Sequence, residues 1–208
     1  TEVYNRWMMA AMEKGNYEEA LQHAEAGLAL SDDRAKKEIA FNQAVCYEYL
    51  GQYEKALELE PADAELYTTL GDVQERLGEV QEALQSYQKA IQIDPNYARA
   101  YNNRGVVYLS QMETEKALAD HRKAVKLAGD RALYHVNVGI VLNRLERYSE
   151  AVTSCNKAIK LDPGYAKAYD IRADAYEGLE QTEKAERDWE TYRSLTKKTE
   201  EEEDTPQA

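Results

Sequence analysis

The chain has 208 residues and a formal net charge of -13 at pH 7, with 43% hydrophobic and 31% charged residues. These proportions are ordinary for a folded protein, and the acidic balance argues against binding to nucleic acid or to an anionic membrane surface, which both require a basic footprint. The sequence contains no apolar run of about eighteen residues, so we expect no membrane insertion.

Cysteine usage and the N-terminal residues bear on the compartment. Cys46 and Cys155 are too few and too far apart for a disulfide framework or a zinc site, so we expect buried free thiols in a reducing compartment. The opening TEVYNRWMMAAMEKG has no initiator methionine and no signal-like apolar core. We therefore expect a cytoplasmic protein, and a targeting segment removed from the N-terminus stays open as an alternative.

A short segment recurs along the chain. GNYEEAL at residues 15–21 returns as GQYEKAL at 51–57 and GEVQEAL at 78–84, and weaker copies follow at 112–118, 146–152 and 180–186. The alanines shared by the copies are Ala20, Ala56, Ala83, Ala117, Ala151 and Ala185, with spacings of 36, 27, 34, 34 and 34. Three successive intervals of 34 indicate one structural unit repeated along the chain.

Apolar residues recur three and four positions apart on both sides of each copy, which predicts two amphipathic helices joined by a tight turn. Pro95 and Pro163 end the second helix in their units. Small residues on the first helix should let the paired helices approach closely, and larger residues on the second should fill the space between them. These are Gly71, Gly105 and Gly139 on the first helix and Tyr87, His121, Cys155 and Trp189 on the second.

With these residues in view, the repeat resembles the tetratricopeptide repeat. The family's pattern is carried by Tyr67, Leu70, Gly71, Ala83, Tyr87, Ala90 and Pro95. The resemblance implies an all-α fold, a right-handed α-solenoid of about six helix-turn-helix units with a C-terminal capping helix. We expect one array over residues 1–199, with units near 1–34, 37–63, 64–97, 98–131, 132–165 and 166–199, and an acidic disordered tail over 200–208.

The second unit is seven residues short. Ala56 reaches Pro61 in five residues, whereas Ala83 reaches Pro95 in twelve. Either the unit carries a true deletion and keeps only a stub of its second helix, or seven residues are missing from the sequence. Consecutive Cα atoms lie about 3.8 Å apart across a trans peptide, so a much wider gap near Leu59–Glu60 would indicate missing residues.

No catalytic constellation is visible. His23, His121 and His135 fall in different units, without a His or Cys neighbour at metal-ligand spacing. A glycine-rich phosphate loop, a nucleophile elbow and an HExxH motif are all absent from the sequence. We expect neither enzyme activity, nor a metal, nor a cofactor.

The resemblance implies a protein–protein interaction scaffold that binds an extended peptide or a partner's tail in a concave groove lined by the first helices. Asn102 and Asn103 should face outward there, and Asn137 follows Asn103 by one full repeat. This row is similar to the asparagine ladder of some tetratricopeptide proteins, where the amide donates to and accepts from a peptide backbone. Asn102 would instead meet a ligand side chain. The alternative is that asparagine merely tolerates an exposed helix surface.

The expected groove residues are Asn42, Thr69, Arg99, Asn102, Asn103, Val106, Asn137, Ile140, Arg144 and Lys167. The later units contribute basic residues, which favours an extended ligand of apolar and acidic character over the fourth and fifth units.

Two other hypotheses concern the partner: binding of a chaperone tail and self-association. A dicarboxylate clamp for chaperone C-terminal tails is incomplete, because Asn102, Val106 and Ile171 stand where the clamp needs lysine, asparagine and arginine. We therefore do not expect a chaperone tail. The functional alternative is a structural protein that self-associates or holds subunits of an assembly through its convex face or its ends.

Overall fold

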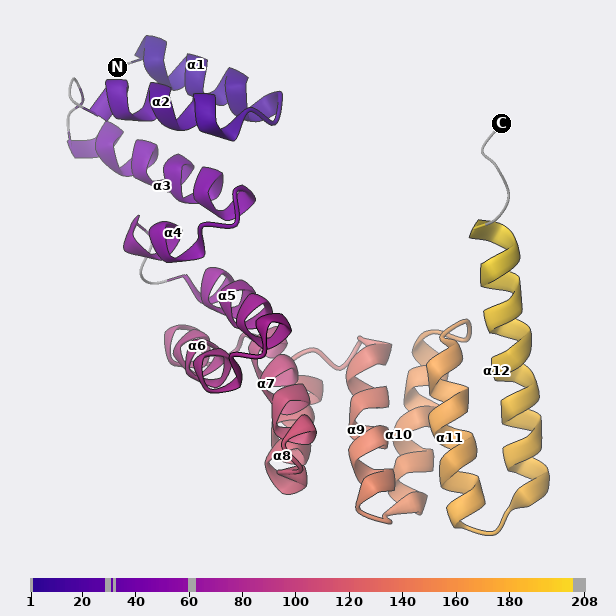
Figure 1. Ribbon diagram of the computed structural model, residues 1–208. Coiled ribbons are helices and arrows are strands. Elements are labelled where there is room, and N and C mark those ends of the chain that lie inside the picture. Colours follow the sequence, from indigo (N-terminus) through magenta and orange to yellow (C-terminus); the bar gives the residue numbers. More distant parts are fainter. Residues whose placement is uncertain (1, 29–30, 32, 60–62, 204–208) are drawn as a thin grey trace. The chain divides into compact units, whose positions relative to one another are not determined.

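A computed structural model describes residues 2–28, 31, 33–59 and 63–203 (Figure 1). Within these ranges the secondary structure consists of twelve α-helices, without a β-strand. The helices are α1 (Glu2–Glu13), α2 (Tyr17–Leu28), α3 (Asp33–Tyr49), α4 (Tyr53–Leu59), α5 (Ala64–Leu77), α6 (Val80–Ile93), α7 (Ala98–Ser110), α8 (Thr114–Leu127), α9 (Ala132–Arg144), α10 (Tyr148–Leu161), α11 (Ala166–Gly178) and α12 (Thr182–Glu203). Successive helices pack as pairs, which we number repeats 1 to 6, and the predicted all-α fold of six helix pairs is confirmed.

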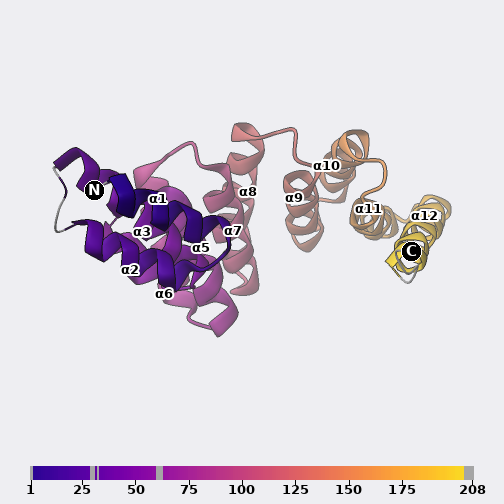
Figure 2. The same cartoon turned by 90° about the horizontal axis from the view of Figure 1, so that it is seen from above.

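The chain divides into two compact parts, an N-terminal half of residues 1–95 and a C-terminal half of residues 96–208. The N-terminal half holds repeats 1 to 3, and the C-terminal half holds repeats 4 to 6. In the C-terminal half, α9 packs against α8, α10 and α11 (Figure 2). Its core includes the buried side chains of Leu118, Val141 and Leu142, which lie on α8 and α9.

Paired helices approach closely because glycine on the first helix receives a larger side chain from the second. A Cβ added to each glycine would fall too close to that side chain. The pairs are Gly71 with Tyr87 Cε1 (2.6 Å), Gly105 with His121 Cε1 (2.9 Å) and Gly139 with Cys155 Sγ (2.8 Å). Tyr87, His121 and Cys155 are fully buried, as predicted, while Trp189 at the equivalent place is only half-buried.

The turn inside each repeat contains a residue with left-handed backbone geometry. Repeats 1 to 3 use glycine at this position, for example Gly78 with φ 81°. Repeats 4 to 6 use Met112 (φ 61°), Glu146 (φ 57°) and Glu180 (φ 59°). Left-handed geometry costs an L-residue roughly 1–2 kcal/mol, so the last three turns are strained where the first three are not.

The second helix of repeat 2 is short, and the last helix of the chain is long. α4 has only seven residues, so repeat 2 carries a short second helix. The Leu59–Glu60 junction lies outside the described residues. α12 continues to Glu203, so its helix extends into the first residues of the predicted tail, where glutamate is a strong helix former. Residues 204–208 also lie outside the described part of the chain.

Two further predictions concern membranes and cysteines. Among the described residues, none of the helices is long and apolar enough to cross a membrane. Cys46 and Cys155 are both free and buried, as the sequence predicts.

Candidate peptide-binding surface

Most residues predicted to bind a peptide lie on the first helices of repeats 4 to 6. We call this surface the first-helix face and define it by Arg99, Asn103, Val106, Asn137, Ile140, Arg144 and Lys167. Val106 is 38% exposed, the three basic residues are exposed, and the remaining three are half-buried. Asn42 on α3 and Thr69 on α5 are half-buried in the N-terminal half.

Asn102 lies inside the protein, and the prediction that it faces outward is wrong. Its side chain is only 4% exposed. Asn102 Oδ1 accepts a hydrogen bond from Asn137 Nδ2 at 2.8 Å and lies 3.2 Å from His121 Nδ1, while Asn102 Nδ2 donates to Asn103 Oδ1 at 3.1 Å. The reason is long-range: the His121 ring, seated over Gly105, reaches from α8 to the amide and satisfies it in the interior.

His121 is the titratable group of this network. Because Asn102 Oδ1 is the acceptor for Asn137, His121 Nδ1 must carry the proton and donate to the same oxygen. His121 Nε2 is buried and has no hydrogen-bond partner among the described residues. Burial lowers the pKa of His121 to about 4, because a second proton would place an unpaired charge in the interior.

Three hydrogen bonds connect neighbouring first helices beneath and beside the first-helix face. They are Asn137 Nδ2 to Asn102 Oδ1 (2.8 Å), Arg144 Nη1 to the Leu109 carbonyl (3.0 Å) and Asn143 Nδ2 to the Ile171 carbonyl (2.8 Å). The first two tie α9 to α7, and the third ties α9 to α11. These bonds fix how the three helices are placed relative to one another, so the surface is held in shape without a ligand.

The charge of the face is modified at its α11 end. Lys167 Nζ donates to Asp170 Oδ2 at 2.7 Å, and this bond raises the pKa of Lys167. Burial, and then the charge of Asp170, raises the pKa of Asp174. Lys167 is therefore partly neutralised within its own helix, and Arg144 is a better candidate to meet an anionic ligand.

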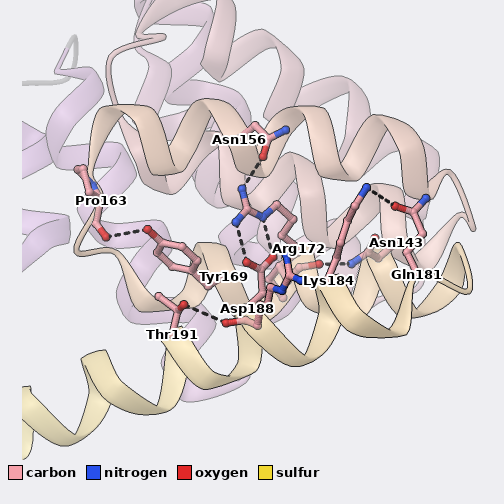
Figure 3. Close-up of polar contacts among 11 residues, drawn as sticks. Asn143, Asn156, Pro163, Tyr169, Arg172, Gln181, Lys184, Asp188 and Thr191 are labelled. Atoms are coloured by element: carbon pink, nitrogen blue, oxygen red, sulfur yellow. Dashed lines mark hydrogen bonds and ion pairs between the residues drawn. The ribbon is translucent and has the colours of Figure 1, made fainter.

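Two ion pairs that the sequence analysis did not single out join first and second helices. Arg104 and Arg172 each form two hydrogen bonds with an aspartate sixteen residues later, Asp120 and Asp188, at 2.7–2.8 Å. Arg172 Nη1 also donates to Asn156 Oδ1 at 2.6 Å (Figure 3). The sequence signal was available, since the same Arg–Asp spacing recurs two repeats apart.

Each of these arginines also lies between two tyrosines of its own helix. The distances from the guanidinium carbon to the ring centroids are 5.7 Å for Tyr101 and Tyr108 around Arg104, and 5.4 and 5.8 Å for Tyr169 and Tyr176 around Arg172. Such cation–π geometry adds to the ion pair. These groups hold α7 to α8 and α11 to α12, and we assign them a structural role.

Comparison with known families agrees with this architecture. Models described as "TPR repeat" or "Tetratricopeptide repeat" match residues 6–60, 52–85, 76–112, 98–130 and 132–165. The chain belongs to the tetratricopeptide repeat family. This fold is that of a protein–protein interaction scaffold, and proteins built on it are typically non-enzymatic.

Solved structures share the fold at low sequence identity. MamA from Desulfovibrio magneticus RS-1 is 18% identical, with 95% of each chain covered and a TM-score of 0.63. A tetratricopeptide repeat protein from Parabacteroides merdae is also 18% identical, covering 93% of this chain and 79% of that one, with a TM-score of 0.65. YrrB, described as a TPR protein with an unusual peptide-binding site, is 21% identical over 83% of this chain and 91% of its own, with a TM-score of 0.67. No curated protein matches the chain.

Proposed function

We propose that this protein is a non-enzymatic cytoplasmic adaptor that binds an extended peptide or a partner's tail along the first-helix face of its C-terminal half. The observation that carries the proposal is the exposed Val106 on a surface whose helices are already tied together by the Asn137–Asn102 and Arg144–Leu109 hydrogen bonds. A surface held in shape before binding loses less conformational freedom when a ligand arrives. Its partner is a protein or peptide, and neither nucleic acid nor a chaperone tail is proposed.

The chemistry of the face suits a ligand that offers backbone and apolar groups together. Val106 and Ile140 supply apolar contact on neighbouring helices. Asn137 Nδ2 is already engaged by Asn102, which leaves Asn137 Oδ1 to accept from a peptide N–H. The exposed guanidinium of Arg144 favours an acidic residue in the ligand, and this pairing would act chiefly on the association rate.

Selection of displayed random peptides against the intact protein tests the proposal. Val106→Lys should abolish binding of most selected peptides, because it puts a charge where apolar contact is needed. Met112→Lys is the matched control, since Met112 is an exposed apolar residue of the same repeat that lies in the turn after α7. If no peptides are enriched, or if both variants bind them equally well, the proposal is wrong.

Self-association is a second candidate, and the apolar surface of α1 favours it. Val3 is 53% exposed, Trp7 51% and Met9 45%. Val3 and Trp7 are four residues apart on α1 and so share one face of the helix, and exposed apolar residues on one face are typical of interaction sites. Light scattering at high protein concentration decides between the candidates: a monomer supports the adaptor, whereas a stable oligomer lost on Trp7→Glu supports assembly.

A further inference from the structure

The C-terminal half contains a cavity of about 260 Å³. Its lining includes none of the residues that define the first-helix face. α8, α9 and α10 surround it. Its apolar floor is made by Val125, Val138 and Leu142. At its rim, Arg122 Nη2 donates to Glu150 Oε2 at 3.0 Å, which links α8 to α10 across the opening.

The cavity exists because repeat 5 departs from its neighbours at one set of positions. In repeats 4 and 6 these positions hold the Tyr–Arg–Tyr group of the first helix and the aspartate of the second. Repeat 5 has His135, Val138, Leu142 and Ser154 in their places. Smaller side chains replace two tyrosines and a bidentate ion pair, so the space that the larger groups fill elsewhere stays open.

Two polar groups of the cavity have no partner within the described residues. In repeat 3 the equivalent serine, Ser86, donates to Gln74 Oε1 at 2.7 Å. In repeat 5 the residue equivalent to Gln74 is Leu142, so the Ser154 hydroxyl makes no hydrogen bond within the described part of the chain. Lys157, one helical turn further along α10, likewise forms no ion pair with a described residue.

The third polar group is His135. Its Nε2 lies 2.9 Å from the Gly129 carbonyl, which can only accept, so Nε2 carries a proton and donates it to this oxygen. This hydrogen bond holds the His135 ring in place at the cavity. The Thr153 hydroxyl donates to the Ser149 carbonyl, and Arg122 and Glu150 pair with each other. The Ser154 hydroxyl and the Lys157 ammonium group therefore remain beside the apolar floor, and the charge of Lys157 complements an anion.

We propose that this cavity is a second protein-binding site, which takes one large apolar side chain of a partner together with a carboxylate from an adjacent Asp or Glu. The apolar side chain lies on Val138 and Leu142, and the carboxylate accepts from Ser154 Oγ and Lys157 Nζ. The volume of about 260 Å³ lies below the roughly 300–1,000 Å³ of cavities that hold drug-sized ligands, which suits a side chain better than a whole small molecule. The site is independent of the first-helix face and goes beyond the function proposed for that face.

The protein's own repeats supply the variant that fills the cavity. Val138→Arg with Ser154→Asp copies the Arg104–Asp120 and Arg172–Asp188 pairs, so the backbone already accommodates this pair on both sides. Lys157→Glu tests the charge without changing the floor. Lys160→Glu is its matched control, because Lys160 is exposed on the same helix and does not line the cavity.

The experiment selects displayed random peptides on the wild-type protein after removing those that bind the filled variant. The peptides that remain should share a Leu, Met or Phe beside an Asp or Glu. Lys157→Glu should weaken them by roughly tenfold or more, with little change for Lys160→Glu and for Val106→Lys. Recovered peptides that are indifferent to Lys157→Glu, recovered peptides that are weakened as much by Lys160→Glu or Val106→Lys, or the absence of any enriched peptide would overturn the proposal.

Discussion

Asn137 Nδ2 donates a hydrogen bond of 2.8 Å to Asn102 Oδ1, and this bond joins α9 to α7 across two repeats. Asn102 is buried, and it also meets His121 of α8. One amide thus connects three helices of the C-terminal half. Its role is to hold the first-helix face in shape. Direct contact with a ligand is made instead by residues of that face, such as Asn103 and Val106.

Replacing Asn102 should destabilise the protein. Asn102→Val places at this position the residue that repeat 5 has there, Val136, and removes the acceptor for both His121 Nδ1 and Asn137 Nδ2. Leaving buried donors unpaired costs about 1–3 kcal/mol of unfolding free energy. Urea unfolding followed by circular dichroism measures it, and Gln92→Val, exposed on α6, should change stability by less than about 0.5 kcal/mol. Equal effects of the two substitutions would contradict the assigned role.

The buried His121 should make stability fall in mild acid. Its pKa is about 4 in the folded protein and 6.5 in the unfolded chain. Above pH 6.5 the residue is neutral in both states. As the pH falls from 6.5 to 4, only the unfolded state takes up a proton, so His121 removes about 3 kcal/mol of stability across this window.

The test for His121 compares the wild type with His121→Tyr, the residue that repeat 3 has at this place. Unfolding free energies are measured at several pH values between 7 and 4, because carboxylates titrate in both proteins and cancel in the difference. The wild type should lose stability faster than the variant as the pH falls. Parallel curves would show that His121 is not held neutral.

Removing one partner of the Arg104–Asp120 pair should destabilise the protein more than replacing both partners. Arg104→Leu alone leaves a buried carboxylate without its partner and should destabilise the protein by about 3 kcal/mol. Arg104→Leu with Asp120→Ser copies Leu70 and Ser86 of repeat 3 and should recover most of that loss. Thermal unfolding of the two variants gives the comparison. A double variant as unstable as the single one would contradict the account.

The strained turns of the later repeats should be improved by glycine. Glu146 has φ 57° in the left-handed region, where an L-residue is disfavoured. Glu146→Gly should stabilise the protein by about 0.5–1 kcal/mol, the remainder being offset by the freedom of glycine in the unfolded chain. The reciprocal change, Gly78→Ala in repeat 3, should destabilise it. Opposite signs in differential scanning calorimetry support the assignment of both turns.

The repeat architecture could be predicted from the sequence because the same features recur at a spacing of 34. Gly71 and Tyr87, for example, predict a close helix pair, and their equivalents two repeats on confirm it. The burial of Asn102 could not be predicted in this way. Asn102 and Asn103 are adjacent on α7, and which of them is buried depends on a histidine of another helix.

The cavity in repeat 5 could be predicted from the sequence only in part. Its signal was present in the sequence, since Val138 and Ser154 stand where Arg104 and Asp120 stand one repeat earlier. That signal becomes visible only when the structure shows that the arginine and the aspartate pair with each other. A comparison of the repeat sequences shows the residues that the repeats share, but it does not show by itself that one repeat lacks an ion pair.

Photo-crosslinking of the selected peptides locates the binding surface most directly. A benzophenone amino acid is placed at Val106 on the first-helix face, or at Leu161, which is 44% exposed near the end of α10, as the control. The account predicts that peptides sensitive to Val106→Lys are labelled from position 106 and not from 161. Labelling from 161 alone, or from neither position, would contradict the proposal that the first-helix face binds the partner.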